Sequence, residues 1–242
     1  MDQVAFVALV SAGQPSAPGY FGYDADLNRR ERGLFDPAAV RALAAADFLR
    51  RRAEGAVVLD ARDPLEFAAG HLAESVNLPA DGRFAELSGT VFGPGREILV
   101  IAPDGRGEEL VTRLARIGFD RAAGHLADPE AVFRAHPELM GRARRLTVHA
   151  LREALDEPRP PLVIDVRGAA EREAGAIPGS LHLPLAELPA RHGDLPADRR
   201  LVLHCAGGLR SSVAASLLRH HGHAEAYDLL GGYAAWEAAP AG

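Results

Sequence analysis

Short apolar runs alternate along the chain with segments rich in helix-forming residues. Residues 56–60, 98–101 and 201–203 have the length and composition of buried strands, with mostly valine, isoleucine and leucine. Residues 213–219, just after the last run, have the composition and periodicity of a helix. Strands that alternate with helices predict a mainly parallel sheet with helices on both faces. We therefore predict an α/β fold.

The same pattern occurs twice, at a spacing of 105 residues. In each copy a strand ends in an Asp-x-Arg sequence, and a glycine and a proline follow at matching distances. The matched pairs are Asp60 with Asp165, Arg62 with Arg167, Gly70 with Gly175, and Pro79 with Pro184. An internal repeat of this length predicts two tandem domains of one fold.

The domain boundaries follow from the repeat and from composition. We place the first domain at residues 36–141 and the second at 146–242, after an N-terminal linker segment at residues 1–35. Three arginines between positions 142 and 145 mark the boundary, and such a basic cluster is typical of a solvated linker.

Composition narrows the classes of function. The chain has 242 residues, a formal net charge of -6 and a single cysteine. The acidic balance argues against a nucleic-acid surface, and no apolar run reaches the length of a membrane-spanning helix. One cysteine excludes internal disulfides and suits a reducing compartment. Since the first residues also lack the basic start of a signal peptide, we predict a cytoplasmic location, with neither nucleic acid nor membrane as a partner.

The strongest candidate for chemistry is the stretch after residues 201–203. It contains Cys205, then Gly207 and Gly208, then Arg210, and it leads into the predicted helix. A glycine loop between a strand and a helix lets successive backbone N–H groups curl around an anion, and the helix N-terminus adds partial positive charge. These groups and Arg210 favour the thiolate of Cys205, which is the nucleophilic form.

A lone cysteine after an apolar strand is in general only a small buried side chain. The two glycines change this interpretation, because they have no use in a core strand but let the backbone approach a ligand closely. We therefore interpret Cys205 and Arg210 as catalytic residues. The predicted substrate-binding residues are those of the same loop: Ala206, Gly207, Gly208, Leu209 and Ser211.

Three segments resemble the rhodanese (sulfurtransferase) family. Residues 205–211, Cys-Ala-Gly-Gly-Leu-Arg-Ser, resemble the active-site loop of that family. Residues 163–185 resemble its opening strand and its "GHIPGA…IPL" segment, with Ala176 where a histidine is usual, and residues 229–236 resemble its closing segment. The resemblance implies an α/β sandwich and a Cys205 that carries a sulfane sulfur as a persulfide. We expect no cofactor and no metal.

Sulfur transfer is therefore the leading hypothesis. The Cys205 thiolate takes the outer sulfur of thiosulfate or of a low-molecular-weight persulfide, and a thiol or cyanide then accepts it. The expected partners are a small anionic sulfur donor and such an acceptor. A cysteine phosphatase or an arsenate reductase uses the same pair of residues. Here the arginine follows the cysteine by five positions, from Cys205 to Arg210, whereas phosphatases related to this fold have a loop that is one residue longer.

The N-terminal segment suggests a third hypothesis. Residues 20–29 resemble the segment that joins a metallo-β-lactamase-fold domain to tandem rhodanese domains in persulfide-dioxygenase-like fusion proteins, and residues 4–10 then correspond to the end of that domain. A surface arm packed by its aromatic side chains is the alternative. No His-x-His-x-Asp-His metal motif occurs. In this hypothesis the chain relays sulfur to or from a separate metallo-β-lactamase-fold persulfide dioxygenase and has weak activity with thiosulfate.

The first copy lacks the nucleophile. After residues 98–101 it has no cysteine, and we expect its loop to be two residues shorter than that of the second copy. Asp104, Glu108 and Glu109 bring negative charge to this loop, which repels an anion. The first domain is therefore predicted to be inactive and to supply one wall of a cleft.

Other polar residues near the loop are predicted to support it. Asp165 and Arg167 end a strand near the loop, and we expect a structural ion pair. His204 precedes Cys205 on an extended segment, so its side chain points to the other face and supports the site rather than acting as a general base. Residues 220–223 include three histidines, but no second cluster of ligands lies nearby, which favours a helix end over a metal site.

Overall fold

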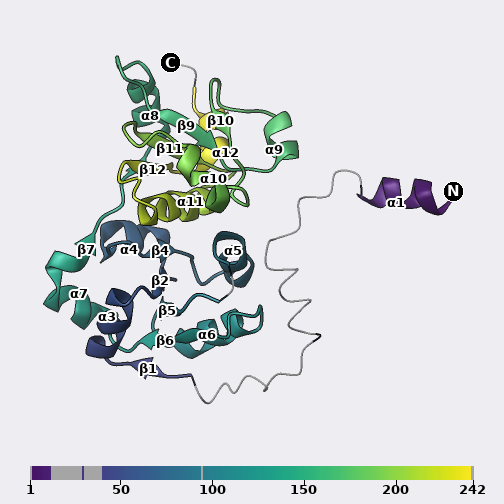
Figure 1. Ribbon diagram of the computed structural model, residues 1–242. Coiled ribbons are helices and arrows are strands. Elements are labelled where there is room, and N and C mark those ends of the chain that lie inside the picture. Colours follow the sequence, from purple (N-terminus) through teal and green to yellow (C-terminus); the bar gives the residue numbers. More distant parts are fainter. Residues whose placement is uncertain (1, 12–28, 30–39, 94, 241–242) are drawn as a thin grey trace.

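A five-stranded parallel sheet lies at the centre of each half of the chain. The computed structural model describes residues 2–11, 29, 40–93 and 95–240 (Figure 1). Residues 12–28 and 30–39, which carry most of the predicted linker and most of its resemblance to fusion proteins, lie outside the described residues. Before them, helix α1 spans Gln3–Ser11.

The first sheet has the strand order β1-β6-β5-β2-β4, and all neighbours in it are parallel. Its strands are β1 (Ala42–Leu43), β2 (Val57–Asp60), β4 (Val76–Asn77), β5 (Ile98–Ile101) and β6 (Ala122–Leu126). One face is covered by α5 (Phe84–Val91) and α6 (Gly107–Ala115), and the other by α3 (Ala45–Ala53) and α7 (Pro129–Ala135). The remaining elements are α4 (Pro64–Ala69), the 3₁₀ helix η2 (Pro137–Leu139) and an antiparallel pair, β3 (His71–Leu72) with β7 (Met140–Gly141).

The second sheet has the order β10-β9-β11-β12-β8 and is also parallel throughout. Its strands are β8 (Arg145–Leu146), β9 (Leu162–Asp165), β10 (Leu181–His182), β11 (Leu201–His204) and β12 (Ala226–Leu229). One face is covered by α8 (Val148–Leu155) and α12 (Gly232–Ala238), and the other by α10 (Leu188–Arg191) and α11 (Leu209–His220). The short helices α9 (Ala169–Glu173) and η3 (His192–Asp194) complete this half.

The predicted fold class is confirmed, since each half is a parallel sheet flanked by helices. Asp60 and Asp165 are the last residues of the equivalent strands β2 and β9. The expected solvated linker between the halves is wrong for Arg145, which belongs to β8 and forms an ion pair of 2.8 Å with the buried Asp228. The domain ranges 36–141 and 146–242 stay a prediction.

Helix α11 is the main contact between the two domains. Its residues 211–218 are all buried, so the helix is covered on every side rather than along one stripe. Its own sheet covers one side, and strand β4 of the first domain packs against another (Figure 1). Across this junction the backbone N–H of Asn77 donates to the Ser216 hydroxyl at 3.0 Å, and the ring of His220 contacts the Glu74 carbonyl at 2.7 Å. A single apolar cluster includes residues of both domains, so we infer that the domains stabilise each other.

We predict that Ser216→Ala lowers the free energy of unfolding by about 1–3 kcal/mol, because the buried N–H of Asn77 loses its acceptor. The control is Ser212→Ala on the same helix, whose hydroxyl donates to the Leu209 carbonyl and forms no hydrogen bond with the first domain among the described residues. Denaturant unfolding followed by circular dichroism measures both variants. Equal losses in the two variants would contradict an interdomain role for the Ser216 hydroxyl.

Candidate functional site

Cys205 follows β11 directly, at the carboxyl end of the central strand of the second sheet. Ligands of open parallel sheets bind beyond this end of the strands. Four residues separate β11 from α11, and the last of them, Gly208, has φ +103°. This left-handed conformation favours glycine, and it lets the chain turn sharply from strand to helix. The turn places the sulfur of Cys205 at the N-terminus of a helix of 12 residues.

The first turn of α12 holds the loop from behind. The backbone N–H groups of Tyr233 and Ala234 donate to the carbonyl groups of Cys205 and Ala206, at 2.7 and 3.0 Å. Gly232 makes this approach possible, because it has φ +59° and a Cβ there would lie 2.4 Å from the Cys205 carbonyl oxygen. With its carbonyl groups turned toward α12, the loop is free to direct N–H groups toward the sulfur. Gly232 belongs to the closing segment of the family resemblance, but this function of it was not predicted from the sequence.

The Cys205 thiol is buried, with 2% of the residue exposed, and accepts from the loop. The N–H of Gly208 donates to its Sγ at 3.1 Å. The Ser211 hydroxyl lies 3.6 Å from Sγ and 3.1 Å from the Gly208 carbonyl, so its proton serves one of the two. The helix N-terminus adds partial positive charge on the same side. This arrangement suits a thiolate or an anion bound to the sulfur.

The predicted substrate-binding residues differ in their exposure. Gly207 is exposed, Leu209 is 40% exposed and Ala206 is half-buried, so these three line the mouth of the loop. Gly208 and Ser211 are buried beneath it, beside the sulfur. The structure therefore brings all of the predicted loop residues together around Cys205, but their roles as substrate-binding residues stay a prediction.

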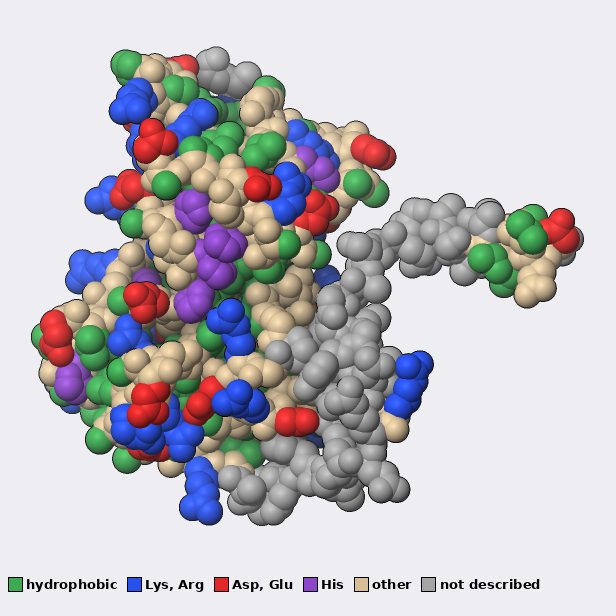
Figure 2. Space-filling model, viewed as in Figure 1, with side chains coloured by type: hydrophobic (Ala, Val, Ile, Leu, Met, Phe, Trp, Pro, Cys, Tyr) green, Lys and Arg blue, Asp and Glu red, His purple; other side chains and the backbone are tan. Residues whose placement is uncertain are grey.

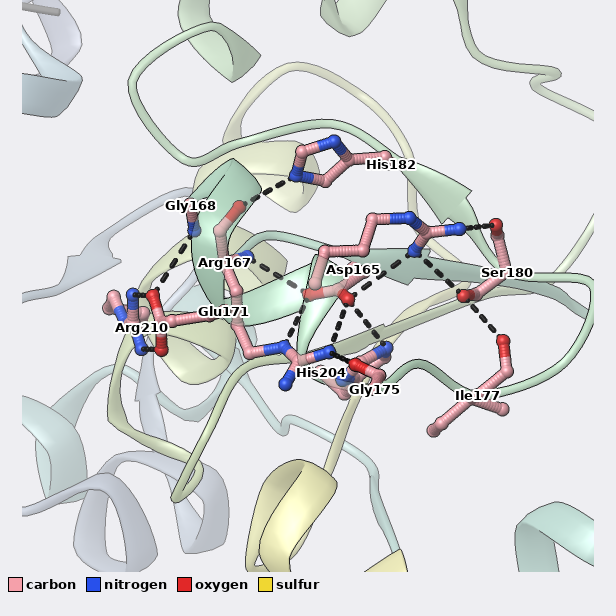
Figure 3. Close-up of polar contacts among 11 residues, drawn as sticks. Asp165, Arg167, Gly168, Glu171, Gly175, Ile177, Ser180, His182, His204 and Arg210 are labelled. Carbon is pink, nitrogen blue, oxygen red and sulfur yellow. Dashed lines mark hydrogen bonds and ion pairs between the residues drawn. The ribbon is translucent and has the colours of Figure 1, made fainter. Parts of the chain in front are cut away.

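Arg210 has a partner that the sequence analysis missed. Its guanidinium donates to both carboxylate oxygens of Glu171, at 2.7 and 2.6 Å (Figure 3). The hydrogen bonds of Arg210 lower the pKa of the Glu171 carboxyl, and the pKa of Arg210 is raised by the same contact. The repeat held a signal for this residue, since Glu66 lies 105 positions before Glu171.

A buried ion-pair network supports the loop on its other side (Figure 3). Arg167 donates to Asp165 at 2.7 Å and also to the carbonyl of Gly175 at 2.6 Å, as expected for a structural pair. Arg172 lies 3.3 Å from the same carboxylate. The Arg167 guanidinium also stacks over the ring of Tyr233, at 4.2 Å from its centroid. The network therefore connects the end of β9 to the first turn of α12, which holds the loop.

His204 lies on the opposite face of β11 from Cys205, as its place on an extended strand predicts. It is fully buried, with its Nε2 at 3.7 Å from the Asp165 carboxylate, and its ring nitrogens have no hydrogen-bond partner among the described residues. Burial lowers the pKa of His204 from 6.5 to about 4, so the ring is neutral near neutral pH. The supporting role of His204 stays a prediction.

The first domain repeats the framework without the reactive group. Arg62 pairs with Asp60 and donates to the carbonyl of Gly70, at 2.6 and 2.9 Å. The Phe119 N–H donates to the Leu114 carbonyl in the first domain, just as the His223 N–H donates to the Leu218 carbonyl in the second, so these helix ends match at a spacing of 104 positions. The strands β5 and β11 before them match at 103 positions. Counted from the strand to the matching turn of the helix, the first domain is therefore one residue shorter, although α6 begins two matched positions later than α11. The expected difference of two is wrong.

This register places Ala102 at the position of Cys205, and Arg106 at that of Arg210. Arg106 pairs with Asp81 at 2.6 Å and with Glu109 at 2.9 Å. Gly107 stands where the second domain has Ser211, and a Cβ there would lie 2.2 Å from the ring of His125. The His125 ring occupies the space that corresponds to the Ser211 side chain of the second domain. The first domain therefore lacks the sulfur, the neighbouring hydroxyl and one residue of the loop.

Two further surfaces lie away from Cys205. Histidines gather where the domains meet (Figure 2), with His192 stacked on His221 at 3.9 Å and near His223. Among the described residues, no group of three or more histidine, cysteine or acidic side chains has an arrangement that suits a metal ion. A hollow of about 740 Å³ is lined by Arg144, Arg199 and Tyr227, among others, and opens at the opposite end of the second sheet. The predicted cleft wall from the first domain stays a prediction.

We predict that Gly232→Ala destabilises the protein by about 1–3 kcal/mol more than Gly222→Ala, because overpacking against the Cys205 carbonyl adds to the strain of a positive φ. Gly222 also has a positive φ, +91°, but nothing lies near the added Cβ. The rate of alkylation of Cys205 by iodoacetamide should change only in Gly232→Ala. Equal stability and equal alkylation in the two variants would contradict the close packing of Gly232 against the Cys205 carbonyl.

We predict that the free energy of unfolding falls as pH drops from 6.5 toward 4. The folded protein keeps His204 neutral down to a pKa of about 4, whereas the unfolded chain binds its proton near 6.5, so protonation stabilises the unfolded state in this window. Between pH 7 and pH 5 His204 should account for about 2 kcal/mol, and His204→Asn should remove that share. His149→Asn, which changes an exposed side chain, is the control. Urea unfolding at each pH measures the difference, and an unchanged slope in His204→Asn would contradict a neutral buried ring.

Comparison with known proteins identifies the family. The rhodanese-like domain matches residues 44–128 and 147–239. The chain is 36% identical to a sulfurtransferase of Allochromatium vinosum over 87 residues, which are 36% of this chain and 81% of that protein. It is 29% identical to a putative sulfurtransferase of Bacillus subtilis over 94 residues, which are 39% of this chain and 90% of that protein.

Two solved structures complete the comparison. A rhodanese-related protein of Thermoplasma volcanium is 30% identical, covers 40% of this chain and 95% of its own, and has a TM-score of 0.36. A metallo-β-lactamase of Staphylococcus aureus is 21% identical, covers 52% of this chain and 35% of its own, and has a TM-score of 0.43. None of the described helices is both long and apolar enough to cross a membrane. Because the rhodanese-like domain matches more than half of the chain, in two segments, this protein is a tandem member of the rhodanese family, and the sulfurtransferases among its relatives support sulfur transfer as its general activity.

Proposed function

We propose that this chain transfers a sulfane sulfur through a persulfide on Cys205. The donor is thiosulfate or a low-molecular-weight persulfide, and the acceptor is a thiol or cyanide. The observation that carries the proposal is the position of the Cys205 sulfur, which accepts the Gly208 N–H at 3.1 Å at the N-terminus of α11. Cys205 is the only cysteine, so the whole cycle depends on one thiol.

The first half-reaction forms the persulfide. The Sγ thiolate attacks the outer sulfur of the donor, and an Sγ–S bond forms as the bond between the two donor sulfurs breaks. The electron pair of the broken bond leaves with sulfite, when thiosulfate is the donor, or with a thiolate, when a persulfide is the donor. The loop N–H groups and the N-terminus of α11 stabilise the negative charge on the terminal sulfur.

The second half-reaction returns the free thiol. An acceptor thiolate or cyanide attacks the terminal sulfur, and the electron pair of the Sγ–S bond returns to Cys205. The exposed Gly207 and Leu209 leave the terminal sulfur open to this attack from the mouth of the loop. Since the two halves share one covalent intermediate, we expect ping-pong kinetics. A reducing compartment such as the cytoplasm keeps Cys205 free between cycles.

The other hypotheses have less support. A phosphatase has less support because the five positions from Cys205 to Arg210 are one fewer than in phosphatases related to this fold, and the terminal nitrogens of Arg210 also donate to Glu171. The relay to a metallo-β-lactamase-fold persulfide dioxygenase stays a prediction, because most of the segment that suggests it lies outside the described residues.

We predict that Cys205→Ser abolishes sulfur transfer, because a serine hydroxyl is not ionised near neutral pH. Intact mass spectrometry after incubation with thiosulfate or glutathione persulfide should detect one added sulfur atom on the wild-type protein and none on the variant. Ser212→Ala, which leaves the loop contacts in place, should still take up the sulfur. Sulfur added to Cys205→Ser, or none added to the wild type by either donor, would contradict the proposal.

A further inference from the structure

The ion pair between Arg210 and Glu171 sets the charge at the mouth of the loop. Arg210 is 27% exposed and Glu171 is 39% exposed in their side chains, so both lie where a donor arrives. Glu171 also accepts the Gly168 N–H at 3.2 Å, which fixes its carboxylate in place. The negative charge of Glu171 thus offsets the positive charge of Arg210, whose guanidinium also interacts with the Cys205 side chain.

The other arginines near the loop are also paired with carboxylates. Arg167 donates to Asp165 and to the Gly175 carbonyl, and Arg172 contacts Asp165 and Ser180 (Figure 3). Among the residues in this view, each guanidinium is therefore held by a carboxylate. What remains for an arriving anion is the partial charge of the α11 N-terminus and the loop N–H groups.

The two donor classes differ in the charge they bring. With thiosulfate, a dianion approaches a thiolate, so three negative charges gather before sulfite leaves as a dianion. With a protonated persulfide, R–S–SH, the thiolate brings the only charge to the reacting atoms: the Sγ–S bond forms, the S–S bond of the donor breaks, and R–S⁻ leaves. A site with little net positive charge penalises the first reaction and not the second.

The geometry points to Glu171 as a specificity-determining residue that selects persulfide donors over thiosulfate. This inference rests on the proposed function and narrows its donor. Glu171 acts through Arg210: it holds the guanidinium and neutralises it, so that the sulfonate group of thiosulfate must compete with a bidentate carboxylate. A persulfide such as glutathione persulfide has no sulfonate bonded to the attacked sulfur, and its carboxylates lie several bonds away, so the reacting end of the donor does not need the arginine.

The first domain indicates that the fold does not need this pair. Glu66 occupies the position of Glu171 and is exposed, while Arg106, at the position of Arg210, pairs with Asp81 and Glu109 instead. The framework around Asp60 and Arg62 forms all the same. The contact between Glu171 and Arg210 is therefore a feature of the second domain, which has the reactive cysteine.

The test compares Glu171→Gln with the wild type, using thiosulfate and glutathione persulfide as donors. Glutamine keeps the length of the side chain and removes its charge. We expect kcat/KM for thiosulfate to rise about tenfold or more, mainly through KM, and that for glutathione persulfide to change less than about threefold. The control is Glu173→Gln, which removes the same charge from α9 at an exposed position that does not contact Arg210. The preference for persulfide should return toward the wild-type ratio when added salt screens the charge freed on Arg210.

The outcomes separate this inference from the proposed function. If both donors change by the same factor in Glu171→Gln, or if Glu173→Gln has the same effect, Glu171 does not determine specificity, although Cys205 still takes up sulfur. If thiosulfate activity falls while persulfide activity holds, Glu171 positions Arg210 for thiosulfate and the inference is wrong. If neither donor adds sulfur to the wild-type Cys205, the proposed function itself fails.

Discussion

The site depends on where two backbone carbonyl groups point. The N–H groups of Tyr233 and Ala234 bind the carbonyl groups of Cys205 and Ala206, and this contact fixes the direction of the loop. A peptide unit that turns its carbonyl one way turns its N–H the other way. By binding these carbonyl groups, α12 turns the N–H groups of Ala206 and Gly207 away from itself, and the Gly208 N–H beyond them donates to the sulfur, so a donor is already in place for negative charge there. The glycine at 232 is a condition of this contact rather than a general source of flexibility.

The aspartate, arginine and glycine contacts occur in both domains, although only the second domain has the reactive cysteine. Both domains keep the aspartate at the end of the strand next to the central one, β2 or β9, the arginine two positions later, and the glycine carbonyl that accepts from it. Both also place that arginine over an aromatic ring, Phe133 in one domain and Tyr233 in the other. Only the second domain adds a sulfur with a neighbouring hydroxyl. The framework therefore holds the end of the sheet in order whether or not a reaction takes place there.

Much of this structure could be predicted from local patterns. The apolar runs gave the central strands, and the Asp-x-Arg repeat located the pair at Asp165 and Arg167 because both partners are close in sequence. The contact between Glu171 and Arg210 was missed because the two lie 39 positions apart: the repeat marks Glu171 through Glu66, but no local pattern connects it to the arginine. The complete burial of α11 could not be predicted from its own sequence either. One of its faces is covered by the first domain, and the periodicity of residues 213–219 does not indicate such a partner. The one-residue difference between the two loops becomes clear from the backbone hydrogen bonds that match between the domains, and the spacing of similar residues in the sequence did not define it.

Helix α11 connects the site at Cys205 to the interface between the two domains. Its N-terminus serves the Cys205 sulfur, and Ser216, two turns later, binds the first domain. A helix that is fixed at both of these points cannot move at one without strain at the other, because packed cores resist continuous deformation. The first domain thus contributes to the site through packing: it completes the burial of the helix at whose N-terminus the Cys205 sulfur lies. This gives a physical reason for the two copies to remain on one chain after one of them has no nucleophile.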